Sequence, residues 1–188
     1  MPYLEELNPA FETKAGSWIL LVGPSSLNTR LLHGIAYLSA QAPERDKPHI
    51  HVLDGGNRFD GFTLARAARG RPEVLNRITV ARAFTCFQLL ALLESTPASD
   101  GPFIILDLLR TFYDESVQAG ERKRLLRVCL AQMQRLEQAG GGLASVHPPA
   151  LSSPAAVELL GMLQAAATDT FFIQPAPEVA LPEQIRMF

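Results

Sequence analysis

Ser17-Trp-Ile-Leu-Leu-Val-Gly23 is a continuous apolar run that a Gly-Pro turn closes, and a helical pattern follows it over residues 28–41. Continuous rather than alternating hydrophobicity is typical of a strand that is buried on both faces. The same pairing of a short apolar run with a helical pattern recurs along the chain. Further strands are expected at 49–54, 78–82, 103–107, 143–147 and 170–173, and further helices at 62–68, 84–93, 121–139 and 154–167. This βαβα order predicts an α/β fold, in which a mostly parallel sheet carries helices on both faces and forms three layers.

Length and composition bound the class of protein. The 188 residues suit one domain, which we divide into an α/β core at 1–174 and a Pro-rich tail at 175–188. A hydrophobic content of 47% is enough to bury a core and excludes intrinsic disorder. The 17 basic and 19 acidic residues exclude a strongly cationic nucleic-acid binder, but they leave room for a local basic patch.

The sequence also bears on location and redox state. No apolar run approaches the length of a membrane span, and the acidic N-terminus lacks the apolar stretch of a signal peptide. A cytoplasmic protein without a membrane partner is therefore expected. Cys86 and Cys129 fit neither a metal-site spacing nor a disulfide framework, so we expect two buried thiols.

The first strand-to-helix connection is the candidate anion-binding loop. Ligands of open parallel sheets bind at the carboxyl ends of the strands. Residues 23–30 have the position and length of a P-loop, G-x-x-x-x-G-K-[ST], but Asn28 replaces the second glycine, Thr29 the lysine and Arg30 the hydroxyl residue. Asn tolerates a left-handed backbone, so a curled loop remains one interpretation. An ordinary turn with a polar helix cap is the other.

Two further strand ends carry polar candidates. Asp107 ends an apolar strand, as the Mg²⁺-organising carboxylate of a P-loop ATPase does, and His147 ends the next strand. The candidate set for a nucleotide or another anion is Gly23, Ser25, Ser26, Asn28, Thr29, Arg30, Asp107 and His147, with Asp107 as the candidate Mg²⁺ ligand. No cofactor is assigned from the sequence. If the set binds one, that cofactor would be ATP or ADP with Mg²⁺.

Five segments in this order resemble the core of the RecA-type recombinase superfamily, nearest its archaeal and eukaryotic branch and the paralogues of those proteins. The segments are Ala15-Gly-Ser-Trp-Ile-Leu-Leu-Val-Gly-Pro24, Leu53-Asp-Gly-Gly-Asn-Arg-Phe-Asp60 with 64–66, Ile78-Thr-Val-Ala-Arg-Ala-Phe84 with 88–90, the Walker B-like Phe103-Ile-Ile-Leu-Asp107, and 125–136 with Gly142-Leu-Ala-Ser-Val-His147. The resemblance covers residues 10–173 and implies a RecA-like fold of the P-loop NTPase type.

The same resemblance implies a degenerate catalytic site. The family's P-loop lysine falls at Thr29, its hydroxyl residue at Arg30, its catalytic glutamate at Gly56 and its sensor glutamine at His147; Asp107 alone is unaltered. Positioning and charge neutralisation supply nearly all of the catalysis of phosphoryl transfer. We therefore expect no ATP hydrolysis at an intact site.

These features predict a catalytically degenerate RecA-like paralogue that acts by binding, as an accessory factor in DNA recombination or repair. Its partner is expected to be a recombinase-related protein or a second copy. One alternative is a nucleotide-binding protein or weak ATPase with a non-standard P-loop, which Leu27 or Arg30 would exclude by filling the phosphate cavity. A second alternative is a single-stranded DNA-binding module that uses the arginines of 66–82 and 122–135, provided that both sets face one way.

Histidines, phenylalanines and nucleophilic residues are the other candidates for chemistry or binding. His33, His49, His51 and His147 have no accompanying cluster at metal-ligand spacing, so a metal site is not expected. The phenylalanines at 59, 62, 84 and 87 are expected in the core, with a partner-binding surface as the alternative. No Ser-His-Asp spacing occurs, and Cys86 has no evident base.

Overall fold

The computed structural model describes residues 14–41, 49–99, 101–150 and 152–174, and these form a six-stranded sheet in the order β3-β2-β4-β5-β1-β6 with every pair parallel. The strands are β1 (Trp18–Val22), β2 (Ile50–Asp54), β3 (Ile78–Arg82), β4 (Phe103–Leu106), β5 (Gly142–Val146) and β6 (Asp169–Phe172). The helices are α3 (Ser26–Gln41), α4 (Gly61–Ala67), α5 (Cys86–Ser95), α6 (Ala119–Gly140) and α7 (Pro154–Ala166), with 3₁₀ turns η1 (Pro72–Arg77) and η2 (Leu108–Tyr113). The predicted α/β architecture is confirmed.

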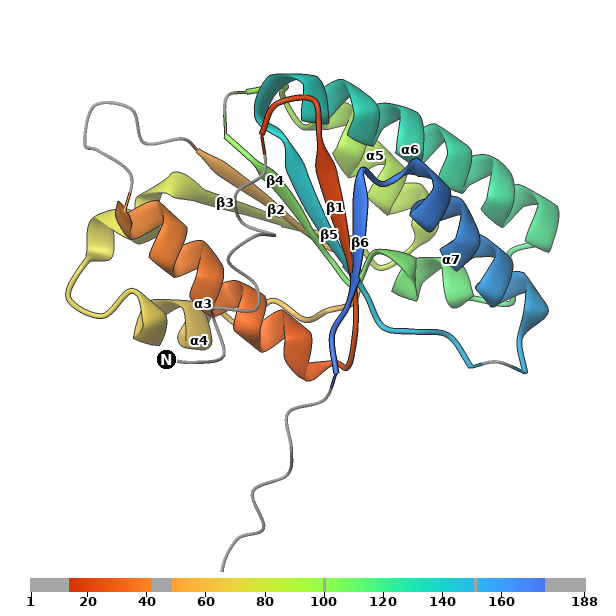
Figure 1. Ribbon diagram of the computed structural model, residues 1–188, viewed down its shortest axis with the longest axis horizontal. Coiled ribbons are helices and arrows are strands. Elements are labelled where there is room, and N and C mark those ends of the chain that lie inside the picture. Colours follow the sequence, from red (N-terminus) through yellow and green to blue (C-terminus); the bar gives the residue numbers. More distant parts are fainter. Residues whose placement is uncertain (1–13, 42–48, 100, 151, 175–188) are drawn as a thin grey trace, which may run out of the picture.

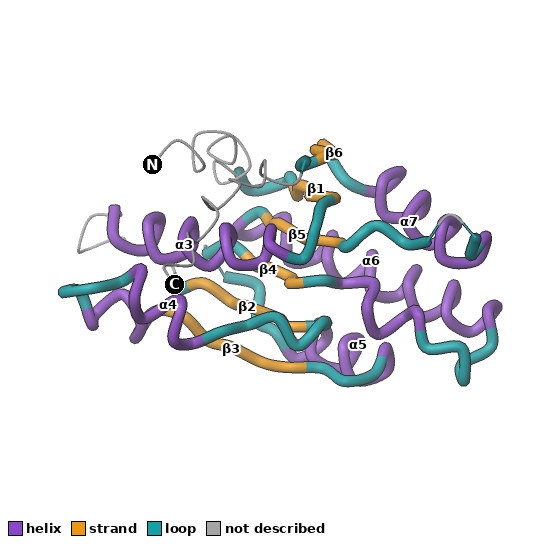
Figure 2. Tube along the Cα trace, turned by 90° about the horizontal axis from the view of Figure 1, so that it is seen from below, coloured by secondary structure: helices purple, strands orange, loops and turns teal. Residues whose placement is uncertain are grey.

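Helices cover both faces of the sheet and make three layers. Figure 1 and Figure 2 show α3 and α4 on one face and α5, α6 and α7 on the other. Each face has its own hydrophobic core. Leu31 and Ile35 of α3 belong to one core, and Leu126 and Met133 of α6 belong to the other.

The position of each strand in the sheet explains its sequence pattern. Every residue of β1, β4 and β5 is buried, because these strands lie inside the sheet and both of their faces carry helices. β3 and β6 lie at the two edges of the described sheet, and most of their residues are exposed or half-buried. Continuous apolar runs therefore mark the interior strands.

Two connections differ from the sequence-based expectation. α3 begins at Ser26, two residues earlier than predicted, which shortens the loop before it. No helix was expected between 107 and 121, but residues after Asp107 form η2, in which Leu108, Leu109 and Phe112 are fully buried. Apolar side chains at these positions pack into the core below α5, α6 and α7.

The structure bears on the expected burial of the two cysteines and on the expected absence of a membrane span. Cys86 and Cys129 are both buried and unpaired, and burial raises the pKa of Cys86 and raises that of Cys129 to about 12. None of the helices in the described ranges is long and apolar enough to cross a bilayer. The expected tail at 175–188 lies outside the described residues.

Candidate functional site at the carboxyl edge of the sheet

The parallel pairing brings the predicted site residues to one edge of the sheet. β1 is in register with β5 up to Val22 and Val146, and β2 with β4 up to Asp54 and Leu106. The chain leaves each strand at the same edge, so the connections after β1, β2, β4 and β5 meet there. The candidate site is this meeting point.

The connection from β1 to α3 is only three residues long, from Gly23 to Ser25. The N–H groups of Leu27 and Asn28 donate to the carbonyl oxygens of Pro24 and Ser25, at 2.9 and 3.2 Å. A phosphate cradle needs such N–H groups directed at the ligand, but here they close a turn. Asn28 has helical rather than left-handed backbone, so the curled loop considered from the sequence is not formed.

Leu27 fills the space beside this turn. Its side chain is 1% exposed and belongs to the core under α3. A Cβ built on Gly23 would lie 3.2 Å from Leu27 Cδ2 and 3.1 Å from Ile173, which follows β6. Apolar side chains therefore lie directly against Gly23 at this turn.

A buried hydrogen-bond chain links three of the connections. Ser145 Oγ on β5 donates to Asn28 Oδ1 at 2.7 Å and accepts from the backbone N–H of Asp107 at 2.9 Å. All three residues are at most 5% exposed. Because buried polar groups need partners, this chain fixes the start of α3 against the ends of β4 and β5.

The Asp107 carboxylate is fully engaged within the protein. Asp107 is 1% exposed and has left-handed backbone, with φ of 51°. Its Oδ1 accepts from the His147 N–H at 3.2 Å, and its Oδ2 accepts from Arg58 Nε at 3.2 Å. The charge that a P-loop ATPase keeps for Mg²⁺ is thus neutralised by the chain's own guanidinium group.

Gly56, the position implied for a catalytic glutamate, has no room for a side chain. A Cβ built on Gly56 would lie 2.7 Å from Asp107 Oδ2 and closer still to Asp107 Cβ. Such distances are far below van der Waals contact. A glutamate at this position therefore requires a different placement of Asp107.

The neighbouring Asp54 stabilises the local structure through hydrogen bonds. It is fully buried, and its two oxygens accept from the backbone N–H groups of Gly56, Arg58 and Phe59 and from Arg82 Nε. Arg82 also donates to the Phe59 carbonyl oxygen at 3.1 Å. Asp54 thus folds the connection after β2 and positions Arg58 over Asp107.

The residues present do not fit a bound Mg²⁺. The one candidate carboxylate, Asp107, is buried and lies 3.2 Å from a guanidinium nitrogen, where a second cation would be repelled. No group of three or more metal-ligating side chains occurs in the described ranges. His49 and His51 lie close together on β2, with ring centroids 5.1 Å apart, but they form no part of such a group.

The remaining members of the candidate set are dispersed. Ser25 and Ser26 are exposed at the start of α3. Thr29 is exposed on the first turn of α3, and Arg30 is half-buried. The His147 side chain is exposed, and the backbone carbonyl oxygen of His147 accepts from the Tyr113 hydroxyl at 3.3 Å. Burial, with a smaller effect of the Asp107 charge, raises the pKa of Tyr113.

Sequence reasoning missed Arg58 and Ser145, which complete the buried site. Arg58 meets Asp107 across 49 positions of the chain, and Ser145 meets Asn28 across 117. Sequence spacing carries no signal for such pairs. The usable signal was positional, since both residues lie at or beyond the carboxyl ends of predicted strands.

The two arginine sets do not share a surface. Arg66 and Arg69 belong to α4 and its end, whereas Arg124 and Arg135 belong to α6 on the opposite face of the sheet (Figure 1). Arg124 is paired with Glu121, and Arg135 donates to two backbone carbonyl oxygens. The condition set for the single-stranded DNA alternative is not met.

Three of the four phenylalanines expected in the core are exposed. Phe62 and Phe84 are each 70% exposed and Phe87 is 50% exposed, whereas Phe59 is half-buried. Phe62 lies on α4, Phe84 lies just before α5, and Phe87 lies in α5. We call Phe62, Phe84 and Phe87 the exposed phenylalanines.

Comparison with known proteins adds no assignment: no protein-family model matches the chain, and no curated protein matches it.

Proposed function

We propose that the protein is a catalytically degenerate relative of the RecA-type ATPase core that acts by binding rather than by hydrolysis. The observation that carries this proposal is the Arg58–Asp107–Gly56 arrangement. The carboxylate is held by a guanidinium group of the same chain, and the catalytic-glutamate position is filled by that carboxylate. The resemblance over residues 10–173 supports the relationship, and the all-parallel three-layer fold is compatible with a P-loop-like domain.

The alternative of a nucleotide-binding protein or weak ATPase is disfavoured by the β1–α3 turn. Its N–H groups bond to carbonyl oxygens of the turn, and Leu27 is buried beside Gly23. An ATP turnover assay tests this directly. We expect no phosphate release above the rate without protein, whether or not single-stranded DNA is present. Turnover that Asp107→Asn abolishes would overturn the proposal.

The binding role is proposed to be that of an accessory factor in DNA recombination or repair. The resemblance supplies the process, and the exposed phenylalanines supply places for a protein partner. Exposed aromatic side chains are enriched in protein interfaces. The Arg82–Phe59 hydrogen bond joins the end of β3, which precedes Phe84, to the connection that precedes α4.

A RecA-type recombinase from the same cells is the partner to test. We expect Phe84→Ser to weaken its binding by about tenfold or more, since central aromatic residues dominate interface energetics. Phe172→Ser is the matched control, because Phe172 is 66% exposed at the opposite edge of the sheet. Equal effects of both substitutions, or no binding to a recombinase, would contradict this role. Self-association that depends on Phe84 would identify a second copy as the partner instead.

A further inference from the structure

A hollow of about 750 Å³ lies between α3 and α4, on the face of the sheet away from α6. Its volume is in the range of small-molecule pockets. Thr29, His33 and Tyr37 line it from α3, and Thr63, Arg66 and Arg69 line it from α4 and its end. It is distinct from the buried cluster around Asp107 and shares only Thr29 with the candidate set.

The described lining of the hollow is cationic. Arg66, Arg69 and Arg71 contribute three positive charges, and no acidic residue occurs among the described residues that line it. Within the described ranges, none of these arginines forms an ion pair with a carboxylate. The whole chain has a net charge of −2, so this concentration of positive charge is local.

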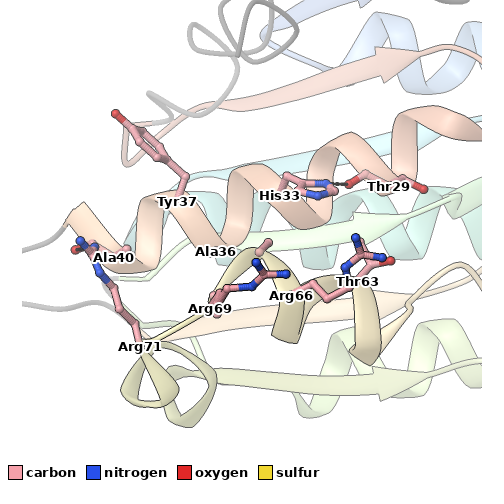
Figure 3. Close-up of a pocket in the computed structure, with 11 residues that line it drawn as sticks. Thr29, His33, Ala36, Tyr37, Ala40, Thr63, Arg66, Arg69 and Arg71 are labelled. Carbon is pink, nitrogen blue, oxygen red and sulfur yellow. Dashed lines mark hydrogen bonds between the residues drawn. The ribbon is translucent and has the colours of Figure 1, made fainter.

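Two arginine side chains reach into the hollow from the α4 side. Figure 3 shows Arg66 and Arg69 extending from the α4 side towards α3, where His33 lies. Arg66 is also held over the Phe62 ring, with 5.7 Å from guanidinium carbon to ring centroid. His33 Nδ1 hydrogen-bonds to the Thr29 carbonyl oxygen at 2.8 Å, which leaves the other ring nitrogen for a ligand.

The rest of the hollow suits an organic group. Ala36 and Ala67 give it a small apolar floor, whereas the half-exposed Tyr37 ring points away from Arg66 and Arg69 (Figure 3). Arg71 lies at the far end, where it donates to the Ala40 carbonyl oxygen at 3.5 Å. The α3 stretch from Thr29 to Ala40 is about 16 Å long, which exceeds the size of an isolated phosphate ion.

We propose that the hollow between α3 and α4 binds a phosphorylated small molecule. Arg66 and Arg69 hold its phosphate group, and the alanine floor contacts its organic part. Guanidinium groups match phosphate oxygens in charge and in geometry. The proposal goes beyond the binding role described above, because it concerns another surface and a different class of ligand.

Calorimetric titration with AMP, a hexose phosphate, inorganic phosphate and citrate tests the proposal. We expect the two phosphate monoesters to bind more tightly than inorganic phosphate, and citrate to bind weakly. Arg66→Ala and Arg69→Ala should each weaken monoester binding by about tenfold or more. Arg69→Lys should retain part of the affinity, and Arg71→Ala should have a smaller effect.

Two controls separate a site from general charge. Arg110→Ala removes an exposed arginine elsewhere and should leave binding unchanged. Ala67→Leu fills the floor without changing charge and should weaken the monoesters more than inorganic phosphate. Equal binding by wild type and Arg66→Ala/Arg69→Ala, or no monoester binding at millimolar concentration, would overturn the proposal. So would binding of an oligonucleotide or phosphopeptide through these arginines when neither monoester binds.

Discussion

Adding one methyl group at Gly56 should destabilise the protein strongly, even though Gly56 has no conformational need to be glycine. The positive-φ glycines of the described chain are Gly16, Gly70 and Gly141, so Gly56→Ala introduces no left-handed backbone strain. The new Cβ would instead lie 2.7 Å from Asp107 Oδ2. It would lie closer still to Asp107 Cβ, which rotation of the side chain cannot move, so Asp107 would have to withdraw by about 1 Å or more to restore a contact of about 3.5 Å.

The magnitude follows from what holds Asp107 in place. Its carboxylate oxygens receive two hydrogen bonds of 3.2 Å, from the His147 N–H and from Arg58 Nε, and a shift of this size cannot keep both. Losing one bond to a charged group costs about 1.5–3 kcal/mol. Overpacking alone costs about 1–3 kcal/mol. We expect Gly56→Ala to lower the free energy of unfolding by about 2.5–6 kcal/mol in total.

Urea unfolding followed by circular dichroism measures this change, with two controls. Gly161→Ala adds a methyl group in α7 where nothing lies within 4 Å, and it should stabilise by about 0.5–1 kcal/mol. In an Asp107→Gly background the clash is absent, so Gly56→Ala should then cost less than about 1 kcal/mol. A Gly56→Ala protein within about 0.5 kcal/mol of wild type would refute the reasoning.

Three further predictions concern buried polar groups and thiols. Ser145→Ala should cost about 1–3 kcal/mol in urea unfolding, because it leaves a buried amide oxygen and a buried N–H without partners; an unchanged midpoint would contradict the hydrogen-bond chain. Burial and the nearby His49 lower the pKa of His51 below 6.5, so the unfolded chain binds more protons and stability should fall as pH decreases below about 6.5. His51→Asn should flatten this fall, and an equal slope would argue against it. Cys86 and Cys129 should resist a thiol reagent at mildly alkaline pH until the protein is unfolded, and rapid labelling of the folded protein would show that they are accessible.

The fold was predictable from the sequence because its signal is local. β1, β4 and β5 are buried on both faces, so each reads as an uninterrupted apolar run. The start of α3 was less predictable, because Ser26 and Asn28 are both polar and a helix can begin at either residue. η2 was not foreseen, because a 3₁₀ segment of six residues is too short to show a helical pattern, although four of its residues are buried.

The site depended on contacts that no local pattern encodes. Asp107 was placed correctly at a strand end, but its pairing with Arg58 arises only because β2 and β4 are neighbours. The hollow between α3 and α4 was also not foreseen. It depends on residues of two separate helices, such as Ala36 of α3 and Ala67 of α4, lining one space, rather than on a motif.

Calorimetric titration of ATP and ADP, with and without Mg²⁺, tests the central claim most directly. The account predicts no Mg²⁺-dependent binding at millimolar nucleotide, and any heat that appears should be insensitive to Asp107→Asn and lost in Arg66→Ala/Arg69→Ala. Micromolar, Mg²⁺-dependent binding that weakens in Asp107→Asn would contradict the account, because it would show that the carboxyl edge of the sheet still holds a nucleotide.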